Sequence, residues 1–279
     1  KTGERFGFCW MRLHVSIPPD PYRHRDLAIA IPPIHSSSEV YVNGELIVQN
    51  GRVGPDNTRA IPDLMPHLEP IFLHPDDNEL VIAVRGAIFH RLVGGMVTPP
   101  SIGRIADLQS RKYRWDLWNT IVVGVYIILI LYHILFWVGR REDHSSILFA
   151  GICAIILSRM ATLNLYFEQL FPLLDVFAFR FKLEYMGPAA CIYVIPAFYA
   201  SLYPDEFWER PLKAAKWIAA ALFVFPVVAP LKYFSLLVPL YQNLLALGIL
   251  VFGTYVLSGL VLAAKRKREG TRIVLLGFV

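Results

Sequence analysis

Cysteine is scarce in this chain: three cysteines occur in 279 residues, and no two of them are close in sequence. Cys9 stands near the N-terminus, whereas Cys153 and Cys191 lie inside apolar stretches, where a free cysteine behaves as a small buried hydrophobic side chain. Without a CxxC pair, neither a disulfide framework nor a cysteine-ligated metal has a basis. We therefore expect no metal site.

Motifs of catalysis are also missing. The sequence has no phosphate-binding loop, no HExxH zinc motif, no serine or cysteine nucleophile motif and no kinase signature. Its eight histidines are scattered without ligand spacing. The acidic pairs Asp76-Asp77 and Asp205-Glu206 each follow a proline, which is typical of a solvated turn or a helix start. We expect no catalytic residue and no cofactor within these residues.

The charge balance argues against a nucleic-acid partner. The chain has 27 Lys and Arg against 22 Asp and Glu, a formal net charge of +5. These cations cluster beside apolar segments and do not form a basic face, so we expect them to contact lipid headgroups. The lipid bilayer is the expected partner.

Apolar sequence is abundant but unevenly placed. Hydrophobic residues make up 55% of the chain, more than the roughly 45–50% that is usual in soluble domains. Residues 1–112 are rich in Pro, Asp, Arg and His, and nearly all the long apolar runs follow them. We predict two parts: a domain over residues 1–112 and a transmembrane helical bundle over residues 113–279.

Five complete membrane spans are predicted in the second part. As a helix the first would reach about 33 Å, enough to cross a hydrocarbon core of about 30 Å. The spans are Leu117–Val138, Ile147–Tyr166, Leu183–Leu202, Ala214–Leu231 and Leu236–Ala264. A sixth is expected to start at Arg272 and to continue beyond Val279. Because an exported domain needs a leader, we also expect a signal peptide before Lys1.

Basic residues in the short loops predict the orientation, since Lys and Arg are retained on the cytoplasmic side. One set of loops carries ten: Arg140, Arg141, Arg210, Lys213, Lys216, Lys265, Arg266, Lys267, Arg268 and Arg272. The opposite set carries three: Arg180, Lys182 and Lys232. The N-terminal domain is therefore predicted outside the cytoplasm. The run Lys265–Arg268 is predicted to be a topology anchor, with a lipid-headgroup or nucleic-acid patch as the alternative.

Two ionisable residues fall inside predicted spans, where a charge is costly unless it is paired. Arg159 lies within the second span and Glu184 starts the third. Because consecutive antiparallel helices usually pack together, we predict an Arg159–Glu184 ion pair that fixes the register of the two helices. Snorkelling is one alternative, and a proton or ion relay that would use His133 is another.

Residues 7–106 show the alternation of apolar and polar side chains that is typical of β-strands. The pair Asn43-Gly44 predicts a tight type I′ hairpin between Val40 and Val48, because both residues can take a positive φ. About seven or eight strands in roughly 100 residues is the density of a β-sandwich or jelly roll. An all-β domain with its own core is therefore expected.

The segment that joins the two parts, Leu108–Asp116, contains neither glycine nor proline. We predict that it continues as a helix into the first span and acts as a stiff coupler. Tyr113, Trp115 and Trp118 stand where this segment meets the membrane, which is typical of an aromatic belt at the headgroup level.

Short motifs in both parts resemble known bacterial modules. Those of the first part are Trp10-Met11-Arg12-Leu13, the Val-Tyr-Val-Asn-Gly hairpin, Leu80–Arg85, and Gly94-Gly95 followed by Ile102-Gly103. They resemble jelly-roll, galactose-binding-like domains found outside bacterial membranes. Those of the second part are Tyr132-His133, Arg140-Arg141, Arg159, Phe171-Pro172, Lys182-Leu183-Glu184-Tyr185 and Leu202-Tyr203-Pro204. They resemble the membrane domain of bacterial seven-transmembrane receptors with diverse intracellular signalling modules.

The resemblance implies a protein of the bacterial inner membrane with a periplasmic N-terminal domain. In that family the last span leads into a cytoplasmic kinase, nucleotide cyclase or phosphatase module, of which these residues contain nothing. A homodimer is the oligomeric state that this signalling logic implies.

Ligand-binding candidates in the outer domain follow from the way sugar-binding jelly rolls work, with an aromatic platform and a few amides or carboxylates. They are Trp10, Glu39, Tyr41, Asn43 and Asn50. Structural roles compete with this interpretation, since Asn43 suits a turn and Trp10 suits core or edge packing. The expected ligand is a small carbohydrate-like molecule or a protein partner.

Together these features favour a sensory receptor that detects an extracytoplasmic ligand and signals through its bundle to a cytoplasmic effector. The leading alternative is a non-catalytic accessory subunit that docks onto a larger membrane complex, because a fold does not fix a function. A transporter is a third option, but no internal repeat is visible.

Overall fold

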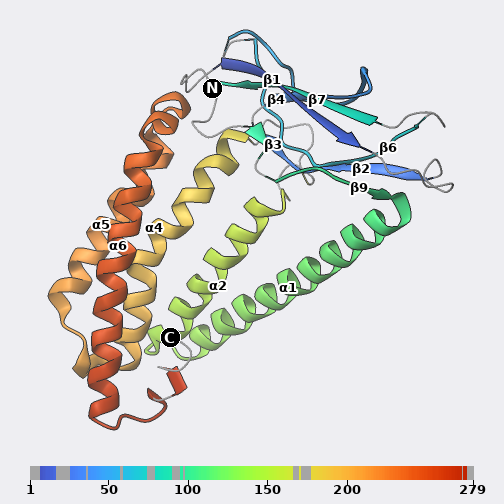
Figure 1. The fold of residues 1–279 in the computed structure, drawn as a ribbon. Coiled ribbons are helices and arrows are strands. Elements are labelled where there is room, and N and C mark those ends of the chain that lie inside the picture. The colour runs from blue at the N-terminus through green and yellow to red at the C-terminus, as the bar shows by residue number, and fades with distance from the viewer. Residues whose placement is uncertain are drawn as a thin grey trace. The chain divides into compact units, whose positions relative to one another are not determined.

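The computed structural model describes residues 7–16, 26–35, 37–56, 59–73, 79–89, 95–96, 98–165, 170, 177–271 and 273–274. Internal contacts divide the chain into a sheet unit, Lys1–Asn119, and a helical unit, Thr120–Val279. Figure 1 shows the strands of the first unit in blue to green and the helices that follow in green to red. The division falls inside a helix, after the composition boundary near residue 112.

The described residues of the sheet unit form nine strands. They are β1 (Gly7–Ser16), β2 (Leu27–Ile31), β3 (Ile34–His35), β4 (Ser37–Val42), β5 (Glu45–Asn50), β6 (His67–Pro70), β7 (Glu79–Ile88), β8 (Gly95–Met96) and β9 (Ser101–Arg104). One sheet has the order β1-β7-β4-β5, a second has β6-β2-β9, and β3 pairs with β8. All these pairs are antiparallel.

Aliphatic side chains from both larger sheets form one core. On β7, Leu80, Ile82 and Val84 are at most 4% exposed, whereas the residues between them are less buried. Ile29 and Ile31 of β2 belong to the same cluster. Because residues of both sheets share this core, the sheets pack face to face, as in a β-sandwich. The jelly-roll connectivity stays a prediction.

The hairpin predicted at Asn43-Gly44 is confirmed. Asn43 has φ 50° and Gly44 has φ 91°, the two positive angles of a type I′ turn. The Asn43 N–H donates to the Val81 carbonyl at 2.8 Å, and the Asn43 Oδ1 accepts the Val81 N–H at 2.9 Å. The turn between β4 and β5 is therefore fastened to a third strand, β7.

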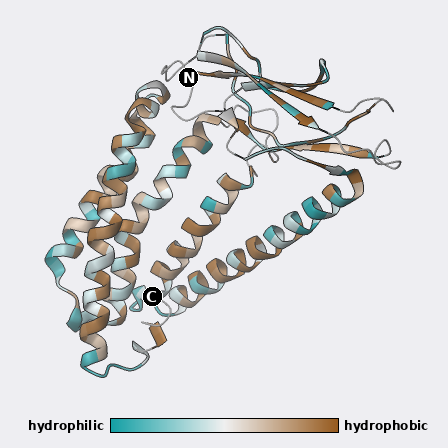
Figure 2. Cartoon of the chain, viewed as in Figure 1, coloured by the Kyte–Doolittle hydropathy of each residue, from teal (hydrophilic) through white to brown (hydrophobic). Residues whose placement is uncertain are grey.

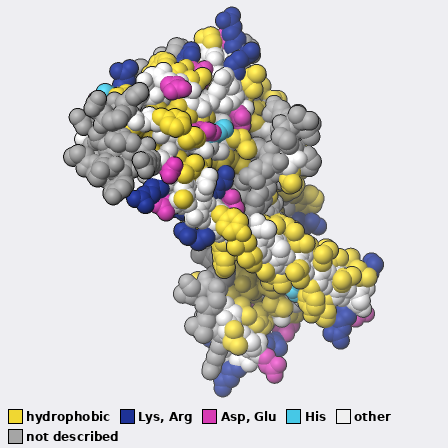
Figure 3. All heavy atoms as spheres, turned by 90° about the vertical axis from the view of Figure 1, so that its right-hand side faces the viewer, with side chains coloured by type: hydrophobic (Ala, Val, Ile, Leu, Met, Phe, Trp, Pro, Cys, Tyr) yellow, Lys and Arg dark blue, Asp and Glu magenta, His cyan; other side chains and the backbone are white. Residues whose placement is uncertain are grey.

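Five helices of the described chain are long and apolar enough to cross a membrane. They are α1 (Ile105–Gly139), α2 (His144–Leu163), α4 (Phe177–Leu202), α5 (Glu209–Val228) and α6 (Leu231–Lys265). Figure 2 shows hydrophobic residues along most of their length, and Figure 3 shows how such side chains gather on one face of the helical unit. The expected helical transmembrane bundle after a sheet domain is confirmed.

Most helix boundaries differ from the predicted spans by several residues, and three of the differences are informative. Helix α1 begins at Ile105, so the predicted helical continuation through Leu108–Asp116 is confirmed. The fourth span was predicted to reach Leu231, but α5 ends at Val228 and Leu231 starts α6. Pro230 explains this break, because the residue before a proline is disfavoured in a helix, and Ala229 is extended.

The third difference is at α4, which begins at Phe177, six residues before the predicted start at Leu183. Several predicted features lie outside the described residues: Tyr166 at the end of the second span, Gly94, Phe171-Pro172, and Arg272 with the residues from 275 onward. Of the predicted sixth span, Ile273 and Val274 are described, and both are helical.

The core of the helical unit is aromatic. Phe181 and Tyr185 on α4 meet Phe234 and Tyr241 on α6 with edge-to-face ring centroids 5.4 to 5.9 Å apart. Further along both helices, Gly248 on α6 allows a close approach to α4. A Cβ at this position would lie 2.7 Å from Ile192 Cδ1. Small residues at such crossings are typical of membrane helices.

Candidate functional site

A row of side chains crosses the outer face of the four-stranded sheet. Trp10 on β1 pairs with Arg85 on β7, and Arg85 pairs with Glu39 on β4. Directly opposed residues of antiparallel strands share a face of the sheet, and the neighbours of Glu39 and Arg85 along each strand are buried in the core. Together with Tyr41, two residues along β4, these side chains form what we term the outer-face cluster.

Contacts within the outer-face cluster combine rings and charges. The Arg85 guanidinium carbon lies 5.8 Å from the centroid of the Trp10 ring, and its Nη1 lies 3.2 Å from Glu39 Oε2. The Tyr41 hydroxyl donates to the same oxygen at 2.9 Å. The Trp10 and Tyr41 rings are 5.5 Å apart. Three of the five predicted ligand candidates, Trp10, Glu39 and Tyr41, are thus brought together.

This arrangement can hold a ligand that is part apolar and part polar. Trp10 is 57% exposed, which leaves an indole surface open to solvent. The hydrogen bond to Glu39 raises the pKa of Tyr41, so the phenol stays protonated and holds the carboxylate in place. A depression lined by Trp10, Met11, Arg12 and Ala83 lies on the same side of the sheet. An exposed ring beside fixed donors and acceptors is a common arrangement for binding.

Asn43 and Asn50 do not join the outer-face cluster. Asn43 is occupied in the hairpin turn, and Asn50 is fully buried, where its Nδ2 donates to the Met65 carbonyl at 2.9 Å. Its Oδ1 lies 2.7 Å from His67 Nε2. Arg85, which does belong to the cluster, was missed. The alternation along β7 places Arg85 on the same face as Ala83, but only the strand register shows that it meets Trp10.

In the helical unit, Arg159 and Glu184 lie side by side. Arg159 Nη1 on α2 is 3.2 Å from Glu184 Oε1 on α4, with side chains 42% and 19% exposed. Gly187, almost one turn further along α4, faces α2, since a Cβ there would lie 3.5 Å from Ile155 Cγ2. The ion pair therefore joins two closely packed helices, and its role in fixing their register stays a prediction.

Arg180, counted among the loop cations, is buried inside the bundle. It is 5% exposed, and its Nη1 donates to the Thr162 carbonyl at 3.1 Å. This bond satisfies a carbonyl in the last turn of α2, which has no partner within its own helix. Because α4 begins before Arg180, this residue lies in a helix and not in a loop, as the predicted start at Leu183 had implied.

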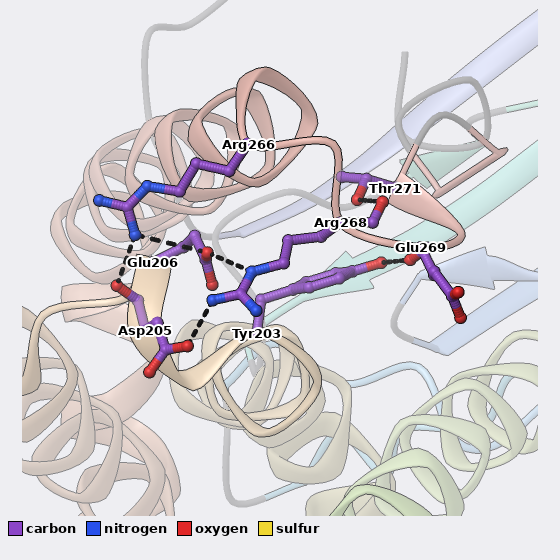
Figure 4. A network of polar contacts seen from close by, with 7 residues as sticks. All are labelled: Tyr203, Asp205, Glu206, Arg266, Arg268, Glu269 and Thr271. Atoms are coloured by element: carbon purple, nitrogen blue, oxygen red, sulfur yellow. Dashed lines mark hydrogen bonds and ion pairs between the residues drawn. The ribbon is translucent and has the colours of Figure 1, made fainter.

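Basic residues of the predicted anchors fall into two groups. Arg266 and Arg268 engage the short 3₁₀ helix η1 (Pro204–Glu206), which follows α4. The Arg268 Nε donates to Glu206 Oε1 at 2.8 Å, Arg268 Nη2 contacts Asp205, and Arg266 Nη1 lies 3.5 Å from Glu206 Oε1 (Figure 4). The hydrogen bond that Arg268 donates to Glu206, and the negative charge of Glu206, raise the pKa of the Arg268 guanidinium. Arg268 therefore stays charged.

For Asp205-Glu206 a solvated turn or a helix start was expected; the structure has a helix start, η1, and Glu206 in it is not solvated. Asp205 is well exposed, but the Glu206 side chain is 1% exposed. The reason is that the turn after α6 folds back over η1, and the Tyr203 hydroxyl also donates to the Glu269 carbonyl at 3.3 Å in this turn (Figure 4). The end of α4 is thus tied to the end of α6.

The other anchors are exposed at helix ends. Lys265 and Lys267 are exposed beside this turn. Arg140 and Arg141 follow α1 and lie 5.9 and 4.9 Å from the ring centroids of Phe136 and Trp137. Cations that rest on rings next to a span suit the headgroup region of a bilayer.

Comparison with known proteins assigns the helical part of the chain to a family. The model of the family described as "7TM diverse intracellular signalling" matches residues 115–279, which include most of α1 and all the helices after it. The chain belongs to this family. As a member of the 7TM diverse intracellular signalling family, it is a membrane protein of a sensory-receptor class. The resemblance expected from Arg159, Lys182–Tyr185 and Leu202-Tyr203-Pro204 is therefore confirmed.

The sheet unit lies almost entirely outside the family match. No curated protein matches the chain. Among solved structures, a glycosyl hydrolase family 2 member from Bacteroides cellulosilyticus DSM 14838 is similar over 37% of this chain, at 15% identity and a TM-score of 0.26. The match covers 15% of that hydrolase. A likeness at this level carries no argument about function.

Proposed function

We propose that this 7TM diverse intracellular signalling protein is the sensing half of a receptor whose sheet unit lies outside the cytoplasm. The outer-face cluster binds a small carbohydrate-like ligand, and the helical bundle passes the change to a cytoplasmic effector. The observation that carries the proposal is the cluster itself: an exposed indole beside a carboxylate and a guanidinium that are already held in place by Tyr41 and by each other.

The chemistry of the cluster favours a sugar over a purely apolar ligand. The apolar face of a pyranose ring stacks on an indole such as Trp10, and ring hydroxyls pair with a carboxylate and a guanidinium. Because Glu39 is already oriented, little side-chain entropy is lost on binding. Glu39 and Arg85 also present charges of both signs, so the site suits neutral sugars with several hydroxyls.

Helix α1 provides a direct route for the signal. It starts at Ile105, immediately after β9, and continues without a break to Gly139. The hydrogen bond from the Ile105 N–H to the Asp26 carbonyl at 2.7 Å fixes its first residue to the start of β2. A movement of this sheet edge is therefore transmitted to the first membrane span, and a bundle with two packings of similar energy would convert it into a signal.

The ligand proposal is tested by thermal unfolding of the full chain in lipid nanodiscs with a panel of neutral mono- and disaccharides. A sugar that binds the folded state adds about 2.7 kcal/mol of stability at 100 times its Kd. Trp10→Ala is expected to remove this stabilisation, and Glu39→Gln to weaken it. Phe72→Ala is the matched control, because Phe72 is 87% exposed and lies outside the cluster. Sugars that stabilise Trp10→Ala as well as the native chain would contradict the assignment.

The orientation is tested with the native exposed cysteine. Cys9 is exposed on β1, whereas Cys153 is buried. A membrane-impermeant maleimide is expected to label Cys9 in cells whose inner membrane is intact. In a Cys9→Ala, Lys267→Cys variant, labelling should require opening of that membrane. The reverse pattern would place the sheet unit in the cytoplasm.

An accessory subunit is the second candidate, and the edge strand β1 supports it. Met11 and Leu13 are 38% and 51% exposed, and β1 has no neighbour on its outer side among the described strands. Such an edge can accept a strand from a partner protein. Copurification of the chain in fixed stoichiometry with a large complex, disrupted by Leu13→Lys, would favour this function over sugar sensing.

A further inference from the structure

Helix α5 contains a proline near its C-terminal end that leaves one backbone carbonyl without its helical donor. In an α-helix the N–H of each residue donates to the carbonyl four residues earlier. Pro226 lies inside α5, is buried and has no N–H, so the Leu222 carbonyl loses this partner. Within a membrane-length helix no water replaces it, and an unsatisfied carbonyl is costly. The Leu222 carbonyl therefore requires a donor from another helix.

Tyr241 of α6 supplies that donor. Its hydroxyl donates to the Leu222 carbonyl at 2.6 Å, and the residue is 3% exposed. Its ring stacks on the ring of Phe225, the residue before the proline, with centroids 5.9 Å apart and 20° between the planes. Tyr241 thus holds α5 at the proline by a ring contact and by a hydrogen bond.

The same hydroxyl lies near a second acceptor, on a third helix. The distance from the Tyr241 hydroxyl to the Tyr185 carbonyl of α4 is 3.4 Å. This carbonyl has a helical donor of its own, because Ala189, four residues later, has an N–H and lies in the same helix. A hydroxyl has one proton to donate, so the two carbonyls compete for it. The shorter distance to the Leu222 carbonyl indicates which bond is made in this conformation.

The connection from α5 to α6 is short and contains a second proline. Helix α5 ends at Val228, Ala229 is extended, and Pro230 precedes the start of α6 at Leu231. The Ala229 N–H donates to the carbonyl of Phe225 at 2.9 Å, which closes the last turn of α5. Because a proline on each side interrupts helical hydrogen bonding, this connection is a point at which α5 can bend relative to α6.

We propose that Tyr241 is the latch of a hinge at Pro226. The hinge is closed while the hydroxyl donates to the Leu222 carbonyl. When α5 bends away, the hydroxyl passes to the Tyr185 carbonyl and remains hydrogen-bonded. Because one hydrogen bond replaces another, the two packings differ little in free energy, which a signalling bundle requires. The inference rests on the proposed signalling role of the helical unit and names the residues that carry its movement.

A double-mutant cycle in lipid nanodiscs tests the latch bond, with thermal unfolding as the measurement. Tyr241→Phe keeps the ring and removes the hydroxyl, and it should lower the Tm by about 2–4 °C, the effect of one hydrogen bond in a unit of this size. Pro226→Ala provides an N–H that satisfies the Leu222 carbonyl. In the Pro226→Ala background, Tyr241→Phe should therefore lower the Tm by less than about 1 °C. Equal losses in the two backgrounds would overturn the proposal.

Tyr255→Phe is the matched control for the cycle. Tyr255 is on the same helix, and its hydroxyl donates at 2.7 Å to the carbonyl of Trp208, the residue that precedes α5. No proline frees this carbonyl, because the residue four positions later, Leu212, has an N–H. The loss caused by Tyr255→Phe should therefore be the same with and without Pro226→Ala.

Fluorine NMR in nanodiscs tests the movement itself. Val228→Cys carries a trifluoromethyl label two residues after Pro226, at a position 74% exposed, in a chain whose native cysteines are replaced by alanine. We expect two environments of the label, and Tyr241→Phe should raise the ratio of the open to the closed environment about fivefold. Pro226→Ala should leave one environment. A single environment in the labelled chain that Tyr241→Phe does not change would show that the bond is only structural and would overturn the hinge.

Both measurements are made without sugar, so they report on the helical unit alone. A failed sugar titration would leave the latch and the hinge standing. Equal losses from Tyr241→Phe in the two backgrounds would leave sugar binding at the outer-face cluster untouched. The two proposals therefore fail separately.

Discussion

The sheet unit and the helical unit use different side chains to hold themselves together. The sheet unit packs aliphatic residues such as Ile29, Ile82 and Val84 between two sheets. The helical unit packs the rings of Phe181 and Phe234 edge to face. The helical unit also uses glycine at helix crossings and pairs charges between helices, as at Arg159 and Glu184.

The difference reflects the two solvents. In water, burial of aliphatic surface drives folding by itself. In lipid, apolar side chains gain little by leaving the acyl chains, so helices associate through close packing and polar contacts. The same kind of substitution should therefore have different costs in the two units, and the following experiments are designed to break or sharpen that contrast.

The largest effect is expected in the aliphatic core. Ile29 is fully buried between the sheets, and Ile29→Ala should destabilise the sheet unit by about 3–4 kcal/mol through lost burial and a residual cavity. Leu13→Ala, at a position 51% exposed on β1, should cost less than about 0.5 kcal/mol. Protease resistance of the sheet unit as a function of temperature measures both. Equal losses would show that this core is not what stabilises the unit.

A smaller but specific effect is expected at the ion pair between α2 and α4. Arg159→Met or Glu184→Gln should each destabilise the helical unit by about 2–3 kcal/mol, since each leaves a charge in the membrane without its partner. The double exchange, Arg159→Glu with Glu184→Arg, should restore most of this stability. Thermal unfolding in nanodiscs is the measurement.

The control for that experiment is another ion pair of the same chain. On α5, Lys213 Nζ lies 2.6 Å from Glu209 Oε2, but the two side chains are 72% and 80% exposed. Lys213→Met should cost no more than about 0.5 kcal/mol. If the double exchange at Arg159 and Glu184 is no more stable than the single variants, the pair does not set the register.

The smallest effect is expected at a helix end outside both cores. Asp143 is the N-cap of α2, where it accepts hydrogen bonds from the Ser145 N–H at 2.9 Å and the Ser145 hydroxyl at 2.5 Å. Asp143→Ala should cost about 1 kcal/mol. These hydrogen bonds lower the pKa of Asp143.

The pH dependence of this cap follows from that direction. Because the folded pKa lies below the unfolded one, the contribution is complete above the ordinary value of 3.8 and is lost as the pH falls through the folded pKa. The stability difference between the native chain and Asp143→Ala should therefore shrink below about pH 4. A difference that is constant down to pH 2 would mean that the carboxylate is not the capping group.

Local sequence signals were sufficient for the elements that local physics decides. Asn43-Gly44 predicted the hairpin, because the required backbone angles belong to those two residues. Apolar length predicted the spans, because membrane thickness fixes it. The rule that consecutive spans pack together predicted that Arg159 and Glu184 lie close to each other. In the structure Arg159 Nη1 is 3.2 Å from Glu184 Oε1.

Long-range contacts were beyond such signals. The burial of Glu206 depends on Arg268, sixty-two residues later in the chain, folding back over η1. Likewise, Arg85 joins the outer-face cluster only because β7 lies between β1 and β4 in the sheet. Asn50 and Asn43 fit the chemistry of a ligand site, but hydrogen bonds to the Met65 carbonyl and the Val81 backbone occupy them. Residue type alone could not distinguish side chains of the outer-face cluster from side chains held in structural hydrogen bonds.

The uninterrupted helix α1 has a consequence for engineering. Since Ile105–Gly139 is one rod with 3.6 residues per turn, one alanine inserted after Asn119 would rotate everything downstream by about 100° and shift it by about 1.5 Å. Seven inserted residues would nearly return the angle to its starting value while lengthening the rod by about 10 Å. Chimeras that graft another sensor onto this bundle should therefore preserve helical phase across the junction before they preserve any particular side chain.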